Sequence, residues 1–134
     1  MRAVDINVLV RLLARDEVKQ VAAAEAFVQT GAWISHLVLM EAVWVLDAVY
    51  NIKPKQIAQG IEMLLDHHEI VIQDADVVKH AVVNYRKHPT VGFSDCLILE
   101  VARAAGHLPL GTFDRKFGKL PGTQALLSAL AKEI

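Results

Sequence analysis

The sequence has few of the residues that mark secreted, zinc-binding or membrane-spanning proteins. Its 134 residues include one cysteine, Cys96, which excludes an internal disulfide and a zinc site made of several cysteines. The most apolar stretch, residues 37–46, contains Glu41 and is shorter than the roughly 20 apolar residues that a spanning helix needs. Asp5 comes too early for the apolar region of a signal peptide. We therefore expect a cytoplasmic protein that does not enter a membrane.

An excess of charge of one sign is also absent. The formal net charge is −1, so composition gives no overall sign of nucleic-acid binding. Basic residues do gather locally, and each cluster is typical of an ordinary solvated surface. The clusters are Arg11/Arg15/Lys19, Arg86/Lys87 and Arg115/Lys116/Lys119. By contrast, 54% of the residues are hydrophobic, which predicts either a large core or an apolar surface covered by a partner.

Strand-like and helix-like segments alternate along the chain, whose length suits one domain over residues 1–134. The patterns predict strands at residues 3–5, 32–35, 70–72 and 108–112. They predict helices at residues 8–14, 17–29, 37–50, 54–66, 74–87 and 95–105, with a turn or short helix at 114–119 and an ambiguous, slightly helical tail at 124–134. We expect Asn7, Ser35, Asp74 and Ser94 to cap helices. The alternation indicates an α/β fold with a parallel sheet covered on both faces.

Four acidic residues stand at the turning points of this pattern. Asp5 closes the first strand, Glu41 interrupts the most apolar helix, Asp95 opens a late helix and Asp114 follows a late strand. In an open α/β sheet, strand ends and the following helix starts gather along one edge. Carboxylates gathered there repel one another unless a cation neutralises them, and Mg²⁺ and Mn²⁺ prefer oxygen ligands. The placement therefore predicts a metal site.

Each of three acids also has a purely structural explanation. Asp5 could cap the following helix, although Asn7 could do this instead and leave Asp5 facing the edge. Asp95 lies in a first helical turn, where the helix dipole favours a negative charge. Asp114 could be a turn residue paired with a neighbouring base. Their shared placement, rather than any one of them, supports the metal site.

Glu41 is surrounded by apolar neighbours in the sequence. A helix that is apolar on nearly every face is buried, and a carboxylate there must be paired, protonated or bound to metal. The alternative is a solvent-facing seam that Glu41 shares with Asp47 and Tyr50. Cys96 has apolar neighbours too and is interpreted as an inert core residue.

Four segments, in order along the chain, resemble the motifs of PIN-domain ribonucleases, most of all those of VapC-type toxins from bacterial toxin–antitoxin pairs. The segments are residues 1–13, 39–46, 93–98 and 112–122, which contain Asp5, Glu41, Asp95 and Asp114 respectively.

This resemblance implies a three-layer α/β/α sandwich with a central parallel sheet and an endoribonuclease that depends on Mg²⁺ (or Mn²⁺). The four acids would be the catalytic and metal-binding residues, with Asp5 and Asp95 as the principal ligands. Polar residues at Asn7, Ser94 and Thr112 would support them. The resemblance also implies an RNA substrate, a homodimer, a tightly bound antitoxin protein, and contact with DNA only through that antitoxin.

The chain departs from the family at one position. Ile6 stands where the family usually has a Thr or Ser, so a hydroxyl that could orient Asp5 or a water is missing. This departure supports an alternative function, a catalytically weak PIN scaffold that acts as a binding and co-repressor protein with its antitoxin. A phosphoryl-transfer domain with Asp5 as nucleophile is disfavoured, because Asn7 stands where such enzymes typically carry a second Asp.

Overall fold

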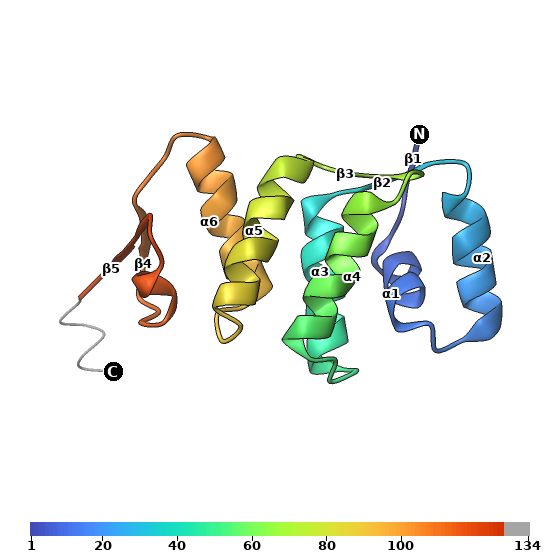
Figure 1. Cartoon of the computed structure of the whole chain (residues 1–134), viewed down its shortest axis with the longest axis horizontal. Helices are drawn as coiled ribbons and strands as arrows, with labels where there is room; N and C mark the ends of the chain where they lie inside the picture. The colour runs from blue at the N-terminus through green and yellow to red at the C-terminus, as the bar shows by residue number, and fades with distance from the viewer. Residues whose placement is uncertain (128–134) are drawn as a thin grey trace.

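The computed structural model describes residues 1–127, in which helices and short strands alternate (Figure 1). In chain order the elements are β1 (Arg2–Ala3), α1 (Ile6–Ala14), α2 (Val18–Val28), β2 (Ala32–Ile34), α3 (His36–Ala48), α4 (Pro54–Asp66), β3 (Ile70–Ile72), α5 (Ala75–Lys87), α6 (Phe93–Ala104), β4 (Leu110–Thr112), the 3₁₀ turn η1 (Phe117–Lys119) and β5 (Thr123–Ala125). No described helix has the length and apolarity needed to cross a bilayer.

All paired strands in the described residues are parallel, which confirms the predicted α/β class. β1, β2 and β3 form one sheet in that order, with Ala3, Trp33 and Val71 side by side in register. β4 and β5 form a second sheet, in which Leu110 lies beside Thr123. The strands therefore divide into two groups, and the described part of the chain contains no pairing between β1 and β4.

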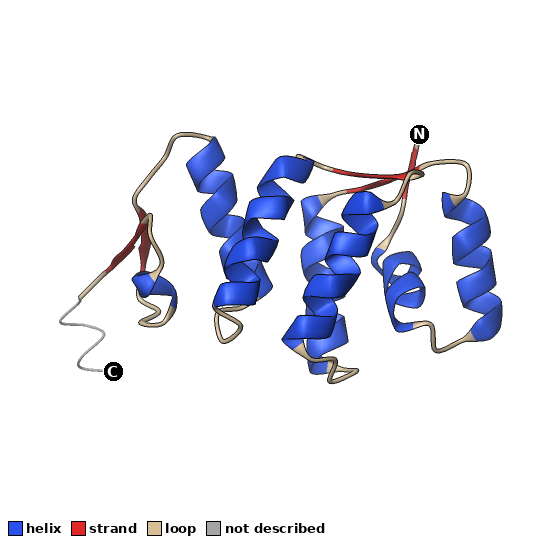
Figure 2. Ribbon diagram, viewed as in Figure 1, coloured by secondary structure: helices blue, strands red, loops and turns tan. Residues whose placement is uncertain are grey.

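Side chains of the larger sheet alternate between a covered and an open face. Ala32, Ile34 and Ile72 point into the core and are buried. The row on the other face is accessible, and Val71 in it is 47% exposed. Steps from β1 to β2 and from β2 to β3 run in the same direction, so right-handed connections place all four intervening helices on one side. Figure 2 shows these strands along one margin of the molecule with the helices below them.

One continuous apolar core links the two groups of strands. It runs from Leu9 on α1 through Leu39 on α3 and Ile61 on α4 to Val78 on α5 and Leu97 on α6, and all five side chains are at most 1% exposed. The core then extends to the turn η1, whose Phe117 is also buried. The carboxyl-terminal strands are thus attached to the rest of the molecule through α5 and α6.

Of the four expected helix caps, Ser35 and Asp74 stand at the cap positions, and Asn7 and Ser94 do not. The Ser35 hydroxyl accepts a hydrogen bond from the Val38 amide at 3.1 Å, so Ser35 caps α3 as predicted. Asn7 lies inside α1, and Asp5 is the cap instead. Gly92, rather than Ser94, stands before α6, because that helix begins two residues earlier than expected. Asp74 precedes α5 without a side-chain cap bond.

The strand β5 was not predicted. The helical interpretation of the tail is wrong at Thr123–Ala125, where parallel pairing with β4 decides the conformation. Local propensity over three residues is too weak to oppose such pairing. The rest of that prediction, residues 128–134, lies outside the described residues.

A buried carboxylate links α5, α6 and the turn at Pro121. Glu100 is 5% exposed and accepts hydrogen bonds from Asn84 Nδ2 at 3.1 Å and from Arg103 Nε at 3.2 Å. The Arg103 guanidinium also donates to the Pro121 carbonyl oxygen at 2.8 Å. Arg103 therefore fastens the segment that carries β4 and β5 to α6.

We expect Arg103→Ala to lower the free energy of unfolding by about 1–3 kcal/mol, because Glu100 and the Pro121 carbonyl each lose a donor. Urea unfolding followed by circular dichroism measures this loss. Lys79→Ala is the matched control, since Lys79 is exposed and 4.0 Å from Asp76, and it should change stability by less than about 0.5 kcal/mol. Equal losses in the two variants would contradict the structural role of Arg103.

Candidate functional site

Asp5 lies between β1 and α1 and already has a local hydrogen bond. Its Oδ1 accepts from the Ile6 amide at 2.7 Å, and the residue is exposed. The expectation that Asn7 would cap this helix and free Asp5 is therefore wrong in this arrangement. Asn7 instead lines a hollow between α1 and α2, together with Arg11 and Phe27.

Glu41 lies on an exposed face of α3. Leu37, Glu41, Trp44 and Ala48 are all exposed, and their spacing makes one stripe along the helix. The expectation of a helix buried on nearly every face is wrong. The alternative is right that Glu41 faces solvent, but the exposed stripe does not include Asp47 and Tyr50.

A hollow of about 410 Å³ links Glu41 to the start of α6. Glu41 and Trp44 line it from α3, Tyr85 lines it from α5, and Phe93 and Ser94 line it from α6. The rings of Tyr85 and Phe93 meet edge to face, with centroids 5.8 Å apart, and form its aromatic wall. Ser94, predicted as a supporting residue, thus lies on the same hollow as Glu41.

Asp95 is half-buried in the first turn of α6, beside the fully buried Cys96. Burial, and next the negative charge of Asp114, raise the pKa of Asp95 above its usual value. Burial, followed by the charges of Asp95 and Glu100, raises the pKa of Cys96 to about 12. The thiol is therefore neutral at physiological pH, which agrees with the interpretation of Cys96 as an inert core residue.

Asp114 follows β4 and holds the turn after it. Its Oδ1 accepts from the Phe117 amide at 3.0 Å, and its own amide donates to the Thr112 hydroxyl at 3.0 Å. Thr112 therefore contacts the backbone of Asp114 and fixes the local turn. The charge of Asp114 acts on Asp95, so Asp95 in α6 and Asp114 after β4 lie near each other.

The four acids do not form one cluster in this arrangement. Among residues 1–127, no three Asp, Glu, His or Cys side chains are placed to hold a metal ion together. Asp95 and Asp114 lie near each other, while Asp5 precedes α1 and Glu41 lies on α3, and these two helices pack against each other. Carboxylate oxygens are the ligands that a hard divalent cation prefers, but these four carboxylates are not close enough together to bind one.

A family model described as the PIN domain matches residues 3–122 of the chain. The chain belongs to the PIN domain family. A search of curated protein sequences found no match. PIN domains are generally nucleases and generally depend on divalent metal, so the fold of this chain is of the nuclease type.

Within the PIN match, sequence reasoning missed the residues around Glu100. The spacing of Glu100 and Arg103 on α6 suggests a pair on the helix surface. Nothing in the sequence shows that Glu100 is buried against Asn84 of α5, because that contact depends on how the two helices pack. These residues position the PIN segment that carries Asp114.

Compared with wild type, we expect Asp95→Asn to increase the free energy of unfolding more at about pH 7 than at about pH 3. The pKa of folded Asp95 is raised, so its contribution to stability is fully present below the unfolded carboxyl pKa of about 4 and is lost as the pH rises through the folded value. The amide cannot ionise and avoids that loss. Urea unfolding at both pH values measures the difference.

Asp76→Asn is the control for this experiment, because the Asp76 side chain is 92% exposed and should show no such pH dependence. If Asp95→Asn changed stability equally at both pH values, ionisation of Asp95 would not oppose folding.

Proposed function

We propose that this PIN-domain protein is an endoribonuclease that depends on Mg²⁺ or Mn²⁺ and serves as the toxin of a cytoplasmic toxin–antitoxin pair. The observation that carries the proposal is the PIN match over residues 3–122, which contains all four acids in the order expected from the motifs. The substrate would be the phosphodiester backbone of RNA, cut by hydrolysis.

In the active protein, Asp5 and Glu41 would lie close to Asp95 and Asp114 and form one metal site with them. A divalent cation bound to such a group lowers the pKa of a bound water and offsets the charge of the phosphate. The protein supplies carboxylates at ends of secondary structure and, through Thr112 and Ser94, polar groups beside two of them. Glu41 or Asp114 would orient the attacking water or accept its proton.

Basic and aromatic side chains around Asp114 support an RNA substrate. Arg115, Lys116 and Lys119 are exposed and form no ion pair within the described residues, whereas Arg15 and Arg86 of the other basic clusters pair with carboxylates. Phe113 is 62% exposed directly before Asp114. Exposed aromatic rings beside cationic groups are suited to stacking unpaired bases and binding their phosphates.

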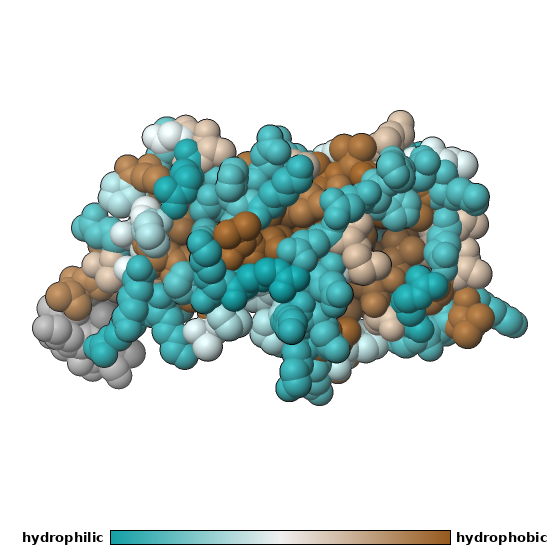
Figure 3. Space-filling model, viewed as in Figure 1, coloured by the Kyte–Doolittle hydropathy of each residue, from teal (hydrophilic) through white to brown (hydrophobic). Residues whose placement is uncertain are grey.

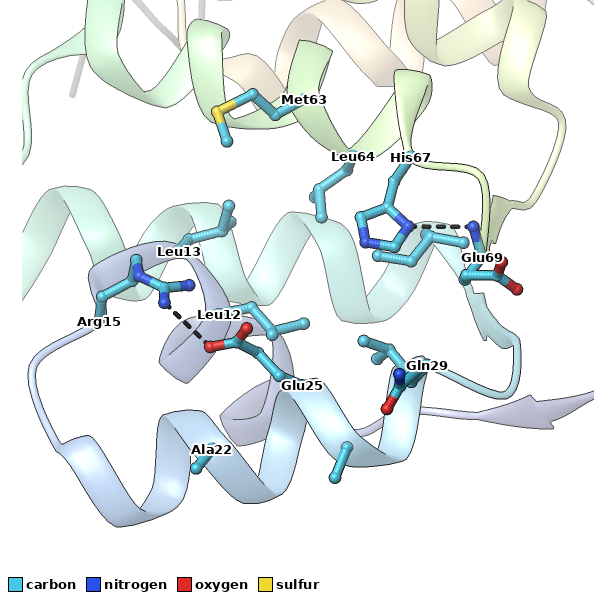
Figure 4. Close-up of a pocket in the computed structure, with 13 residues that line it drawn as sticks. Leu12, Leu13, Arg15, Ala22, Glu25, Gln29, Met63, Leu64, His67 and Glu69 are labelled. Atoms are coloured by element: carbon cyan, nitrogen blue, oxygen red, sulfur yellow. Dashed lines mark hydrogen bonds and ion pairs between the residues drawn. The ribbon is translucent and has the colours of Figure 1, made fainter.

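The antitoxin would cover an apolar groove between α1, α2 and α4. Its cavity of about 630 Å³ is lined by Leu12 and Leu13 from α1 and by Met63 and Leu64 from α4. In Figure 4 these side chains face one another across the groove, with Arg15 and Glu25 paired at its rim. An apolar helix or strand of a partner would fill such a groove, and the proposed complex would contact DNA only through that partner.

One observation favours the alternative of a catalytically weak scaffold. Ile6 is partly buried and packs against the core, so the residue that replaces the usual hydroxyl serves the packing of α1. If the wild-type protein binds its antitoxin but cuts RNA only after Ile6→Thr, the scaffold describes the natural sequence.

We expect protein freed of any antitoxin to cut single-stranded RNA with Mg²⁺ or Mn²⁺ and to lose the activity with EDTA. Asp5→Asn and Glu41→Gln should each lower the rate by at least about 100-fold, because each removes one carboxylate from the reacting centre. A gel assay on total cellular RNA measures cleavage. Asp76→Asn, which changes an exposed acid on α5, should leave the rate unchanged.

Full activity of Glu41→Gln would show that the assignment of the metal-binding residues is wrong, while the enzyme class would stand. Absence of cleavage by wild type under every metal condition, with the antitoxin removed, would overturn the proposed activity.

We expect Met63→Lys to weaken antitoxin binding by at least about 10-fold, because it places a charge in the apolar groove. Met63 is 66% exposed, so the change should not unfold the protein. Val83→Lys is the matched control on α5, since Val83 is 50% exposed and lies outside the groove. Calorimetric titration of both variants with the antitoxin measures the difference, and equal affinities would exclude this groove as the binding surface.

A further inference from the structure

Four strand edges in the described chain lack a partner, one each on β1, β3, β4 and β5. β1 pairs only with β2, and β4 pairs only with β5, so each offers one open edge of backbone N–H and C=O groups. Both edges belong to parallel sheets, which are normally enclosed rather than left open to water. An open edge readily accepts another strand.

Apolar surface is exposed on the sheet that carries β1 and on α6, the helix that precedes β4. On the larger sheet it is the row Ala3, Trp33 and Val71, which no described helix covers. On α6, Ile98 is 43% exposed and Val101 is 42% exposed, and they share one face of that helix. Figure 3 shows apolar atoms reaching the surface between hydrophilic ones on one side of the molecule. A sheet face without a helix and a helix face without a sheet are complementary.

The chain cannot bring these surfaces together in the arrangement described. α5 is fixed beside α4 by the buried Val78 and Val82 and by an ion pair in which Arg86 donates two hydrogen bonds to Glu62. In Figure 1, α6 and β4 lie beyond α5 at one end of the molecule, and β1 lies toward the other end. A second copy of the chain offers the same α6 and β4 without disturbing that packing.

We propose that two copies associate reciprocally, so that β4 of each pairs in parallel with β1 of the other and α6 of each covers the apolar row of the other. Such an interface uses the same two surfaces on both copies and closes with two-fold symmetry. It pairs the open edges of β1 and β4 and removes both apolar faces from water, which the 54% share of hydrophobic residues also favours.

The association would also bring the four acids together into a metal site, and this part of the inference rests on the proposed function. Parallel pairing brings the carboxyl ends of β1 and β4 together. Asp5 follows the first strand and Asp114 follows the second, with Asp95 close to Asp114. Each metal site would therefore combine Asp5 and Glu41 from one copy with Asp95 and Asp114 from the other, and one chain alone would hold an incomplete site.

The first test is complementation between two inactive variants. Asp5→Asn and Asp114→Asn copies, each with a different affinity tag, are co-expressed, and mixed dimers are isolated through both tags. A mixed dimer contains one site with both changes and one site with neither, so it should show about half of wild-type RNA cleavage and Mn²⁺ binding. If each chain held its own site, both sites would carry a change and the mixed dimer would be as inactive as either variant, which would overturn the proposal.

The second test needs no activity and therefore separates this inference from the proposed function. Ala3→Cys copies are mixed with Gly111→Cys copies of a different tag length and treated with a short thiol cross-linker, while the native Cys96 remains fully buried. The expected product is a covalent pair made of one copy of each variant, with little product from either variant alone. A chain with both changes that cross-links internally, and so stays monomeric on a denaturing gel, would overturn the proposal even if RNA cleavage is found.

Discussion

The packing of α5 against α4 determines how the two groups of strands are placed. Val78, Ala81 and Val82 of α5 are buried, and Ile61 of α4 is buried with them in the common core. The Arg86–Glu62 pair closes the exposed side of this contact. Because α6 and both carboxyl-terminal strands follow α5, this one helix contact decides where they lie relative to the first sheet.

The four acids do not gather into one cluster, and three of them have a local role that satisfies the carboxylate. Asp5 caps α1, Asp114 holds the turn before Phe117, and Glu41 faces water on α3. Asp95 is different, since burial and the nearby Asp114 already disfavour its charge. The same side chains that could hold a cation are thus accommodated by ordinary capping and solvation. This explains why a sequence with four such acids folds without a metal cluster in the described residues.

The segment that carries Asp114 depends on a polar contact inside the protein. Glu100 orients Arg103, and Arg103 holds the backbone at Pro121, while Phe117 and Leu120 anchor the same segment in the apolar core. A buried carboxylate is costly unless hydrogen-bonded, and both Glu100 oxygens accept bonds from neighbouring side chains. The position of Asp114 relative to Asp95 is therefore set by residues that take no part in the proposed chemistry.

The sequence by itself determined the α/β class, the order of the elements and the family. Alternating apolar runs, the Pro54 start of α4 and the Ser35 cap act over a few residues, so they can be read from neighbours in the chain. Only the tertiary structure decided that Glu41 is exposed, that Glu100 is buried, that Thr123–Ala125 pairs with β4, and that β1 and β4 stay apart. Each of these depends on which surfaces meet across long stretches of sequence, and the energy of such contacts belongs to the pair of surfaces rather than to either segment alone.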